Sequence, residues 1–210
     1  SKLAIGFTIS VQYIGQDVLA TVERSTLSAP TGNVRVLADA TGRILAIGVA
    51  GGAAVSGGKT SPGGWQFAGA GVITVNTVGG SSGPGGRIEA TVTDGVLTSG
   101  TGKTIEVKAV DTTSISANAG AAALAVATQK ASATIAAGAA IAENQIRRSV
   151  KATTSRTTVT SGGTVSVTAS GSAEITAIAV GVSVAVSTAG GAAVALSGSG
   201  GSKVAAPDAG

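Results

Sequence analysis

The side chains that could carry out chemistry in this 210-residue chain are few, because the sequence has neither histidine nor cysteine. Imidazole bases, thiol nucleophiles, disulfides and the usual zinc sites are therefore excluded. Acid–base chemistry would have to come from ten Asp and Glu residues, and such chemistry normally uses paired carboxylates. The main candidates each stand alone in the sequence, so only the fold could pair them: Asp17, Asp39, Glu89, Asp94, Asp111 and Glu174.

Other ligand-binding signals are weak. "GTGKT", Gly100 to Thr104, resembles the end of a phosphate loop, but Leu97 and Val96 stand where the earlier glycine is required, so a turn before a strand explains it better. Calcium-binding nonapeptides are absent from the sequence. With only four aromatic residues, sugar-binding platforms are scarce. We expect no enzyme, and no catalytic, cofactor-binding or metal-binding residues.

Two pairs of threonines, Thr91 with Thr93 and Thr158 with Thr160, fall in segments of the chain that align with one another. On stacked strands they could form a ladder of hydroxyl and methyl groups that binds ice or glycan. The first copy of the same segment has Thr21 followed by Glu23, which breaks the ladder. The preference of threonine for strands is the simpler explanation.

The composition indicates a chain that folds around small side chains. It has 33 glycines and 11% charged residues, where globular proteins have about 25%. Mean hydropathy is +0.44, which argues against disorder. Arg147, Arg148 and Lys151 form the only basic cluster, and without aromatic neighbours it predicts a solvated edge rather than a nucleic-acid site. The apolar stretch from Ala173 to Leu196 is interrupted by glycines, so we expect no membrane span.

The sequence repeats itself. Ile105, Val107, Ala109, Ile115 and Val126 correspond to Val165, Val167, Ala169, Ile175 and Val186 at an offset of 60. Val34, Val36, Ala38, Ile44 and Ala46 take the same places at an offset of 71 from the first set. The segments between these blocks also align, on Val18, Ile88 and Val150, and bring Gln12, Asn76 and Asn144 into correspondence. The middle copy has an insertion at Ser81 to Gly86, predicted to be a surface turn.

Short Val/Ile/Thr-rich strands separated by Gly/Ser turns indicate an all-β protein. We predict a parallel β-solenoid, or β-helix-like rod, built from three tandem repeats in one elongated domain over residues 1–200. The units are about 4–68, 69–136 and 137–200, followed by a linker or tail at 201–210. Because a coil usually takes about 20 to 30 residues, each unit is expected to supply two or three coils.

The Ala-rich stretch from Asn118 to Ile146 favours helix by propensity, but its counterparts in the other copies are rich in Gly and Val, so we predict strand. Read as strand, Val180, Val182, Val184 and Val186 share one face, which would fill the interior. The opposite small-residue face would either pack within the same chain or associate with another molecule. Its candidate residues are Gly181, Ser183, Ala185 and Ser187, with Ala121, Ala123, Ala125 and Ala127.

The stretch "VSVTASGSAEITAIAVGVSVAVS", an Ala/Gly block and then "AIAENQIRRSVKATTSRTTVTSGG" resemble the tandem repeats of very large bacterial surface and adhesin-like proteins, akin to filamentous-haemagglutinin-type exoproteins. The resemblance covers nearly the whole chain and implies an extracellular or cell-surface β-solenoid stalk without catalytic residues. We therefore expect a structural or adhesive repeat protein that binds itself or neighbouring repeats of a longer chain, forming a fibre or stalk. The alternative is an adhesin module that binds glycan or ice through the Thr-rich face.

Overall fold

The computed structural model describes residues 2–56, 64–79, 86–128, 131–188 and 191–209. Within these ranges every regular element is a strand, and all strand pairings are parallel. The strands form one six-stranded sheet and three sheets of three strands. The prediction of an all-β fold with parallel sheets is therefore confirmed. No helix in the described part of the chain has the length and hydropathy needed to cross a membrane.

The strands fall into three successive rows and a final strand. The first row is β1 (Lys2–Ile14), β2 (Val18–Glu23), β3 (Thr26–Ala29), β4 (Val34–Ala40) and β5 (Arg43–Ser56). The second is β6 (Gly64–Gly79), β7 (Gly86–Thr93), β8 (Val96–Thr101), β9 (Ile105–Asp111) and β10 (Ser114–Ala127). The third is β11 (Ala131–Ser155), β12 (Thr158–Gly162), β13 (Val165–Gly171) and β14 (Glu174–Ser187), and β15 (Ala192–Ala209) follows it.

Each strand pairs with the strand that holds the equivalent place in the next row. Val34 pairs with Ile105, and Ile105 pairs with Val165, as the sequence alignment predicts. The first-row partner of Val126 is Val55 rather than Ala46, whose partner is Ala117, so that one correspondence was misplaced. The remaining aligned positions are direct partners across the rows.

The expected number of coils per unit is wrong. All pairings join different rows, and none of the described strands pairs with another strand of its own row. The long strands explain the difference, because β5, β6 and β10 run for 14 to 16 residues where a short coil would turn. One repeat therefore makes a single passage along the molecule and back.

The predicted unit boundaries do not coincide with the ends of strands. The boundaries at 68/69 and 136/137 fall inside β6 and β11 instead of between strands. The segment 201–210, predicted as a linker or tail, is up to Ala209 the second half of β15, which pairs with β11 from Ala133 to Val150. The predicted insertion turn at Ser81 to Gly86 lies almost entirely outside the described residues; only Gly86, the first residue of β7, is described.

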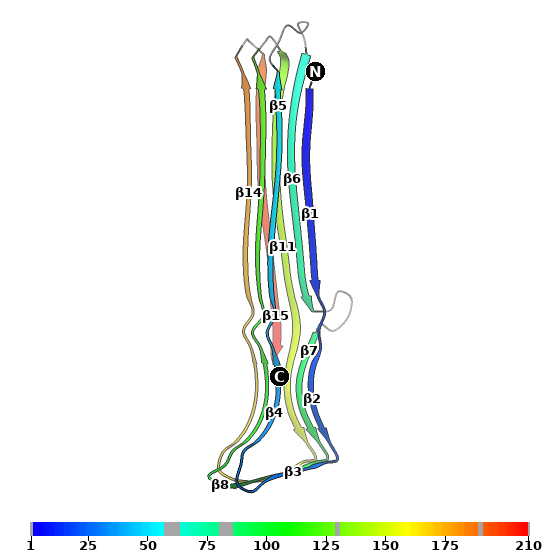
Figure 1. The fold of residues 1–210 in the computed structure, drawn as a ribbon, viewed down its shortest axis with the longest axis vertical. Coiled ribbons are helices and arrows are strands. Elements are labelled where there is room, and N and C mark those ends of the chain that lie inside the picture. Colours follow the sequence, from blue (N-terminus) through cyan, green and yellow to red (C-terminus); the bar gives the residue numbers. More distant parts are fainter. Residues whose placement is uncertain (1, 57–63, 80–85, 129–130, 189–190, 210) are drawn as a thin grey trace.

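Two regions follow each other along the rod, and we call them the arm and the foot. The arm contains β1, β5, β6, β10, β14, β15 and β11 up to Arg147, while the foot contains the remaining strands and the end of β11. In the arm, two layers of long strands lie against each other and run in opposite directions (Figure 1). In the foot, β3 and β8 run across the end of the molecule and connect the two layers (Figure 1).

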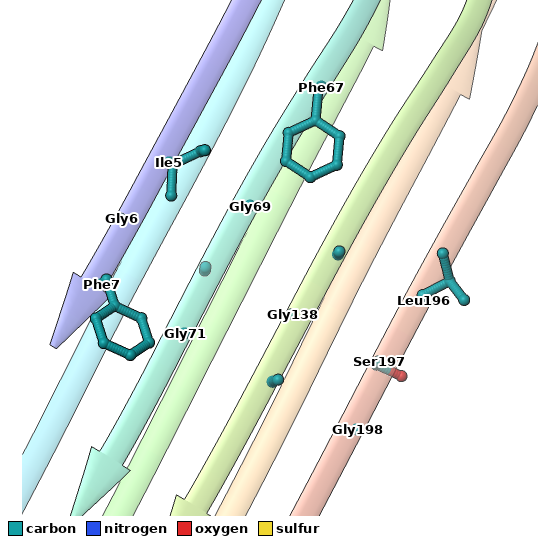
Figure 2. Close-up of a pocket in the computed structure, with 13 residues that line it drawn as sticks. Ile5, Gly6, Phe7, Phe67, Gly69, Gly71, Gly138, Leu196, Ser197 and Gly198 are labelled. Carbon is teal, nitrogen blue, oxygen red and sulfur yellow. The ribbon is translucent and has the colours of Figure 1, made fainter. Parts of the chain in front are cut away.

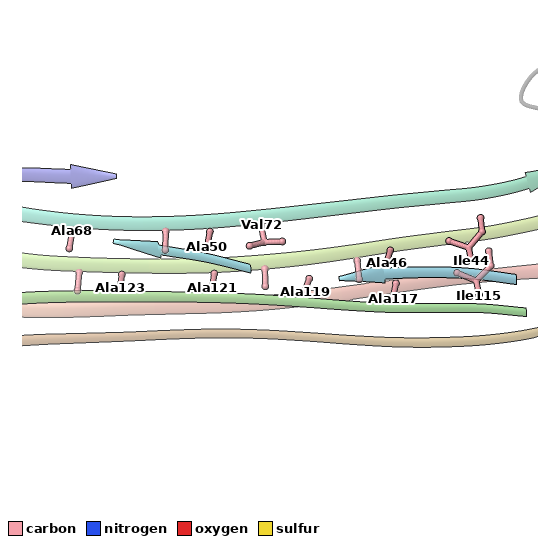
Figure 3. Close-up of a cluster of buried hydrophobic side chains, with 14 of the residues drawn as sticks. Ile44, Ala46, Ala50, Ala68, Val72, Ile115, Ala117, Ala119, Ala121 and Ala123 are labelled. Atoms are coloured by element: carbon pink, nitrogen blue, oxygen red, sulfur yellow. The ribbon is translucent and has the colours of Figure 1, made fainter. Parts of the chain in front are cut away.

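Most of the interior of the arm is made of small side chains, which reverses the sidedness predicted for β14. The predicted strand conformation of the Ala-rich stretch is confirmed by β10 and β11. Alternate alanines of this stretch, such as Ala119, Ala121 and Ala123, point inward together with Ala46, Ala50 and Ala68 (Figure 3). Val180, Val182, Val184 and Val186, predicted to fill the interior, are instead 39% to 50% exposed on the outside of β14.

Close approach of the two layers is the physical reason. A Cβ added at Gly6 would overlap the Gly51 carbonyl oxygen, and one added at Gly138 would overlap the carbonyl oxygen of Val182. Sheets with ordinary side chains pack about 10 Å apart, and valines at these inward positions would force the layers toward that separation. At these positions only Gly, Ala, Ser and similar small residues fit. Larger buried side chains such as Ile44, Ile115 and Ile146 lie in the part of the arm next to the foot.

The foot has ordinary sidedness. Its interior contains fully buried large side chains, including Ile88, Leu97 and Ile105, and its outward positions are largely polar. At the corner after β2, β7 and β11 the residues Arg24, Asp94 and Arg156 take the left-handed conformation, with φ of 45°, 52° and 47°. The same turn is thus repeated at equivalent places in the three rows.

Candidate self-association surfaces

Strands with a free hydrogen-bonding edge bound the stack of rows at its two ends, the first and the last row, and these edges run along the length of the rod (Figure 1). At one end β1 to β5 each pair on one side only with a described strand, and at the other end β12, β13, β14 and β15 do so. A parallel edge presents unpaired N–H and C=O groups that can accept another strand. In each sheet, a strand added at the free edge would run parallel to its neighbour, as in the pairings already present.

The last row also exposes side chains that its neighbours bury. Val165 and Val167 of β13 are 48% and 45% exposed, while their partners Ile105 and Val107 are each 1% exposed. Val34 and Val36, their equivalents in the first row, are 6% and 5% exposed although β4 also pairs on one side only, so this exposure belongs to the last row alone. An apolar surface of the interior kind is therefore open at this end.

Polar contacts across the rows hold the foot in register. The backbone N–H and Nη2 of Arg87 donate to the Asp17 carboxylate at 2.8 and 3.1 Å, and Arg156 donates to Asp94 from Nε and Nη2 at 2.5 and 3.0 Å. These bonds hold the pKa of Asp17 below its ordinary value, mainly through the Arg87 N–H, and that of Asp94 below it through the Arg156 side chain. Asp94 in turn raises the pKa of Arg156.

A buried polar layer separates the two cores. Arg148 Nη1 lies 3.2 Å from Asp111 Oδ1, both side chains have no exposed surface, and the Thr113 hydroxyl donates to the same oxygen at 2.5 Å. The prediction that Arg148 lies on a solvated edge is therefore wrong. Nearby in the arm, Asn76 Nδ2 donates to Asn144 Oδ1 at 2.8 Å, so the aligned asparagines form a buried ladder.

The sequence predicted the Asn ladder positions but missed the ion pair. Asp111 and Arg148 lie 37 residues apart and belong to different rows. Nothing in the sequence around either residue marks it as buried. The pairing of these two buried charges can therefore be recognised only in the folded structure.

The residues proposed as self-association faces do not lie on the surface. Ala121, Ala123, Ala125 and Ala127 are buried in the arm. Their partners in β14, Gly181, Ser183, Ala185 and Ser187, lie on the same inward side and are half-buried. A Cβ at Gly181 would overlap the carbonyl oxygen of Gly198 in the opposite layer. The alternative that this face packs inside the same chain is the one observed.

The four threonines do not form one ladder. Thr91 and Thr93 lie in β7 and pair with Thr153 and Ser155 of β11. Thr158 and Thr160 lie in β12, in a different sheet, where Thr158 pairs with Val96. The two pairs are therefore separate, and no continuous Thr-rich face joins them.

The outward faces of the arm are apolar on both layers. We call the outward side of β1, β6, β11 and β15 the β1 face, and that of β5, β10 and β14 the β5 face. On the β1 face the exposed large residues are Leu3, Ile5, Phe7, Ile9, Val11, Tyr13, Trp65, Ile141, Val194 and Leu196. On the β5 face they are Leu45, Ile47, Val49, Val55, Leu124, Ile178, Val180, Val182, Val184 and Val186.

Each face contains a shallow groove with a floor of small residues. On the β1 face a groove of about 520 Å³ is lined by Phe7, Phe67, Gly69, Gly71, Ala139 and Leu196. Figure 2 shows Phe7 of β1 on one side and Leu196 of β15 on the other, with Phe67 on β6 beside Gly69. On the β5 face a groove of about 530 Å³ is lined by Gly51, Ala53, Ala122, Leu124, Val182 and Val184. Their linings offer hydrophobic contact and few polar groups.

The candidate carboxylates do not gather. Asp17, Asp94 and Asp111 are each bound to a different arginine, and within the described ranges no three His, Cys, Asp or Glu side chains lie together as metal ligands would. The turn predicted at Gly100 to Thr104 is present, with Gly102 at φ 69° between β8 and β9.

Comparison with known proteins found no match for this chain among protein-family models, curated proteins or solved structures.

Proposed function

We propose that the chain is a structural element that joins end to end with further copies, and that its three rows act as three coils of a parallel β-solenoid. The exposure of Val165 and Val167 carries the proposal, because a following row would bury them as β13 buries Ile105 and Val107. The free parallel edges at both ends would supply the hydrogen bonds of the same joint. The product is a fibre or stalk, in the extracellular or cell-surface setting that the resemblance implies.

Equivalence of the rows supports this joint. Successive rows already pair residue for residue over the whole circuit, so the contact between two molecules would repeat the contact between two rows. A head-to-tail contact of this kind does not close by itself and gives an open filament. The alternative of a Thr-rich ligand face has no support from the arrangement of the four threonines.

The proposal is tested by Val167→Lys, with Thr168→Lys as the matched control. Val167 points inward but is open to solvent, so lysine fits the single molecule and places a charge where the next row would bury it. Thr168 is the exposed neighbour on the same strand. Negative-stain electron microscopy over a concentration series should show filaments for the parent and for Thr168→Lys, and short rods for Val167→Lys.

A parent protein that stays a single short rod at every concentration would refute self-joining and leave the free edges to neighbouring repeats of a longer chain. Filaments that persist in Val167→Lys would show that the joint lies elsewhere.

A further inference from the structure

The apolar outer faces of the arm are not used by the end-to-end joint, because they lie at right angles to the strand edges. On the β5 face, β5 carries no charged residue after Arg43 and β14 none after Glu174. On the β1 face, β1 has no charge after Lys2 and β6 has none, while β11 places Glu143 and Arg147 only near the foot. Soluble monomers rarely expose apolar patches beyond about 300 to 600 Å². The arm therefore calls for a partner that covers at least one face.

The β1 face has the dimensions of a stable protein interface. Four strands about 4.8 Å apart and 13 residues long at about 3.3 Å per residue cover about 800 Å². That is the area which each partner contributes to an interface of standard size. The β5 face has three strands and covers about 600 Å² by the same measure, so the β1 face is the better candidate.

The relief of the β1 face is complementary to itself. Ile9, Ile73 and Ile141 are direct partners across three rows and form an outward line that we call the isoleucine ridge. Two residues before Ile141, Ala139 of β11 lines the open part of the groove, while the Phe7 ring covers its partner Gly71 on the central strand. Ridge and groove thus lie side by side, about 7 Å apart along the strands.

We propose that two copies of the chain pair through their β1 faces with the arms antiparallel, each isoleucine ridge entering the groove of the other. A two-fold axis in the interface, parallel to the ridge and midway between ridge and groove, places the ridge of each copy over the groove of the other. This is the self-complementarity that an isologous dimer requires. The ridge is accessible, since Ile9 is 60% and Ile141 48% exposed. The two feet then lie at opposite ends of the pair.

A lipid bilayer is the other apolar partner, and the strand edges argue against it. Lipid-exposed sheet edges do not occur in the hydrocarbon region, because water is not available there for the free N–H and C=O groups. In the arm β1 and β5 have such edges over their whole length among the described strands. A second copy covers the apolar face and leaves those edges in water or in the end-to-end joint.

The inference deepens the proposed self-assembly by naming a second, lateral contact, and the Val167→Lys background separates the two. This variant blocks end-to-end growth, so light scattering coupled to size exclusion should give a dimer at micromolar concentration. Adding Ile141→Lys should raise the dimer dissociation constant at least about 30-fold, whereas Ile47→Lys on the β5 face should leave it unchanged. Circular dichroism would establish that all three variants remain folded.

Two uncharged substitutions of the same residue test the groove itself. Ala139→Phe in the same background fills the groove floor and should prevent pairing, while Ala139→Ser should retain it. A Val167→Lys protein that is monomeric throughout, or a dimer insensitive to Ile141→Lys and Ala139→Phe, would overturn the proposal without affecting the end-to-end joint. Flotation with phosphatidylcholine vesicles, lost in Ile141→Lys, would also overturn it and identify lipid as the partner.

Discussion

The arm and the foot belong to the same three rows and share one parallel register, yet they place large side chains on opposite sides. In the foot, Ile88 and Ile105 are inside and polar residues outside. Along most of the arm, alanine and glycine are inside, and residues such as Ile47 and Val182 are outside. Alternation therefore specifies that a strand has two different faces, and the spacing between layers decides which one is inside.

A buried polar layer lies at the change from one arrangement to the other. Asp111 comes at the end of β9 in the foot, and Arg148 lies where β11 passes from arm to foot. Apolar side chains could slide along the rod without large cost, but there is one position in which these two buried charges meet. We infer that it fixes where the small interior ends and the large interior begins.

Asp111→Asn should have the largest effect on this boundary. It leaves the Arg148 charge buried without its partner, which costs about 4 kcal/mol of unfolding free energy. Urea denaturation followed by circular dichroism would measure the loss. The double variant Asp111→Leu with Arg148→Met should recover most of it, because apolar replacements remove both buried charges. Equal loss in both variants would mean that the charges are not what stabilises the boundary.

Truncation of one isoleucine in each region tests the reversed sidedness directly. Ile105→Ala should lower the unfolding free energy by about 3 kcal/mol, because it leaves a cavity in the foot. Ile47→Ala in the arm removes a 64% exposed side chain and should change it by less than about 0.5 kcal/mol. Comparable losses at the two sites would contradict the assignment of inside and outside in the arm.

Addition of one methyl group tests the closeness of the arm layers. Gly181→Ala should destabilise by about 2 kcal/mol, because the new Cβ meets the Gly198 carbonyl and must separate the layers. Gly120→Ala is the matched control, since nothing lies within 4 Å of its Cβ. The control should be neutral or slightly stabilising, because alanine restricts the unfolded chain. Thermal unfolding of the two variants would separate these outcomes.

Acid should weaken the foot before the arm, and this is the smallest expected effect. Because the pKa of Asp94 is lowered in the folded protein, its contribution is complete above the unfolded value near 3.8 and is lost as pH falls through the folded pKa. Hydrogen exchange should then show lower protection at β7, β8 and β12 while β10 is unchanged. Asp94→Asn, which tolerates the left-handed backbone, should remove part of this pH dependence. Uniform loss of protection would contradict it.

The sequence predicted the repeat and the register closely but not the sidedness. Pairs such as Val34 with Ile105 follow from matching patterns, because in-register stacking brings equivalent residues together. The reversed arm could not be predicted from β14, where valine alternates with Gly, Ser and Ala, since either set can be buried. Glycines such as Gly138 and Gly181 are the evidence, but only the opposing backbone shows what they accommodate.

The residues of the candidate site were likewise predicted only in part from the sequence. The Asn ladder was marked by a shared residue type at equivalent positions, whereas Asp111 and Arg148 have no such mark. The small-residue faces were proposed as outer surfaces because their flatness suits close stacking, and that stacking occurs within the chain. The number of coils was wrong because typical coil lengths say nothing about strands that continue for 14 residues or more.

The pairing of every strand with another row also has a consequence for how the chain folds. Val34 pairs with Ile105 and Ile105 pairs with Val165, so the first hydrogen-bonded pairings between strands must close loops of about 60 to 70 residues. Folding dominated by such distant contacts is slow. A completed row, by contrast, offers a template on which the next row can add without searching. We therefore expect a long lag before the first pair of rows forms and fast addition of rows afterwards. Preformed rods added as seeds should shorten the lag.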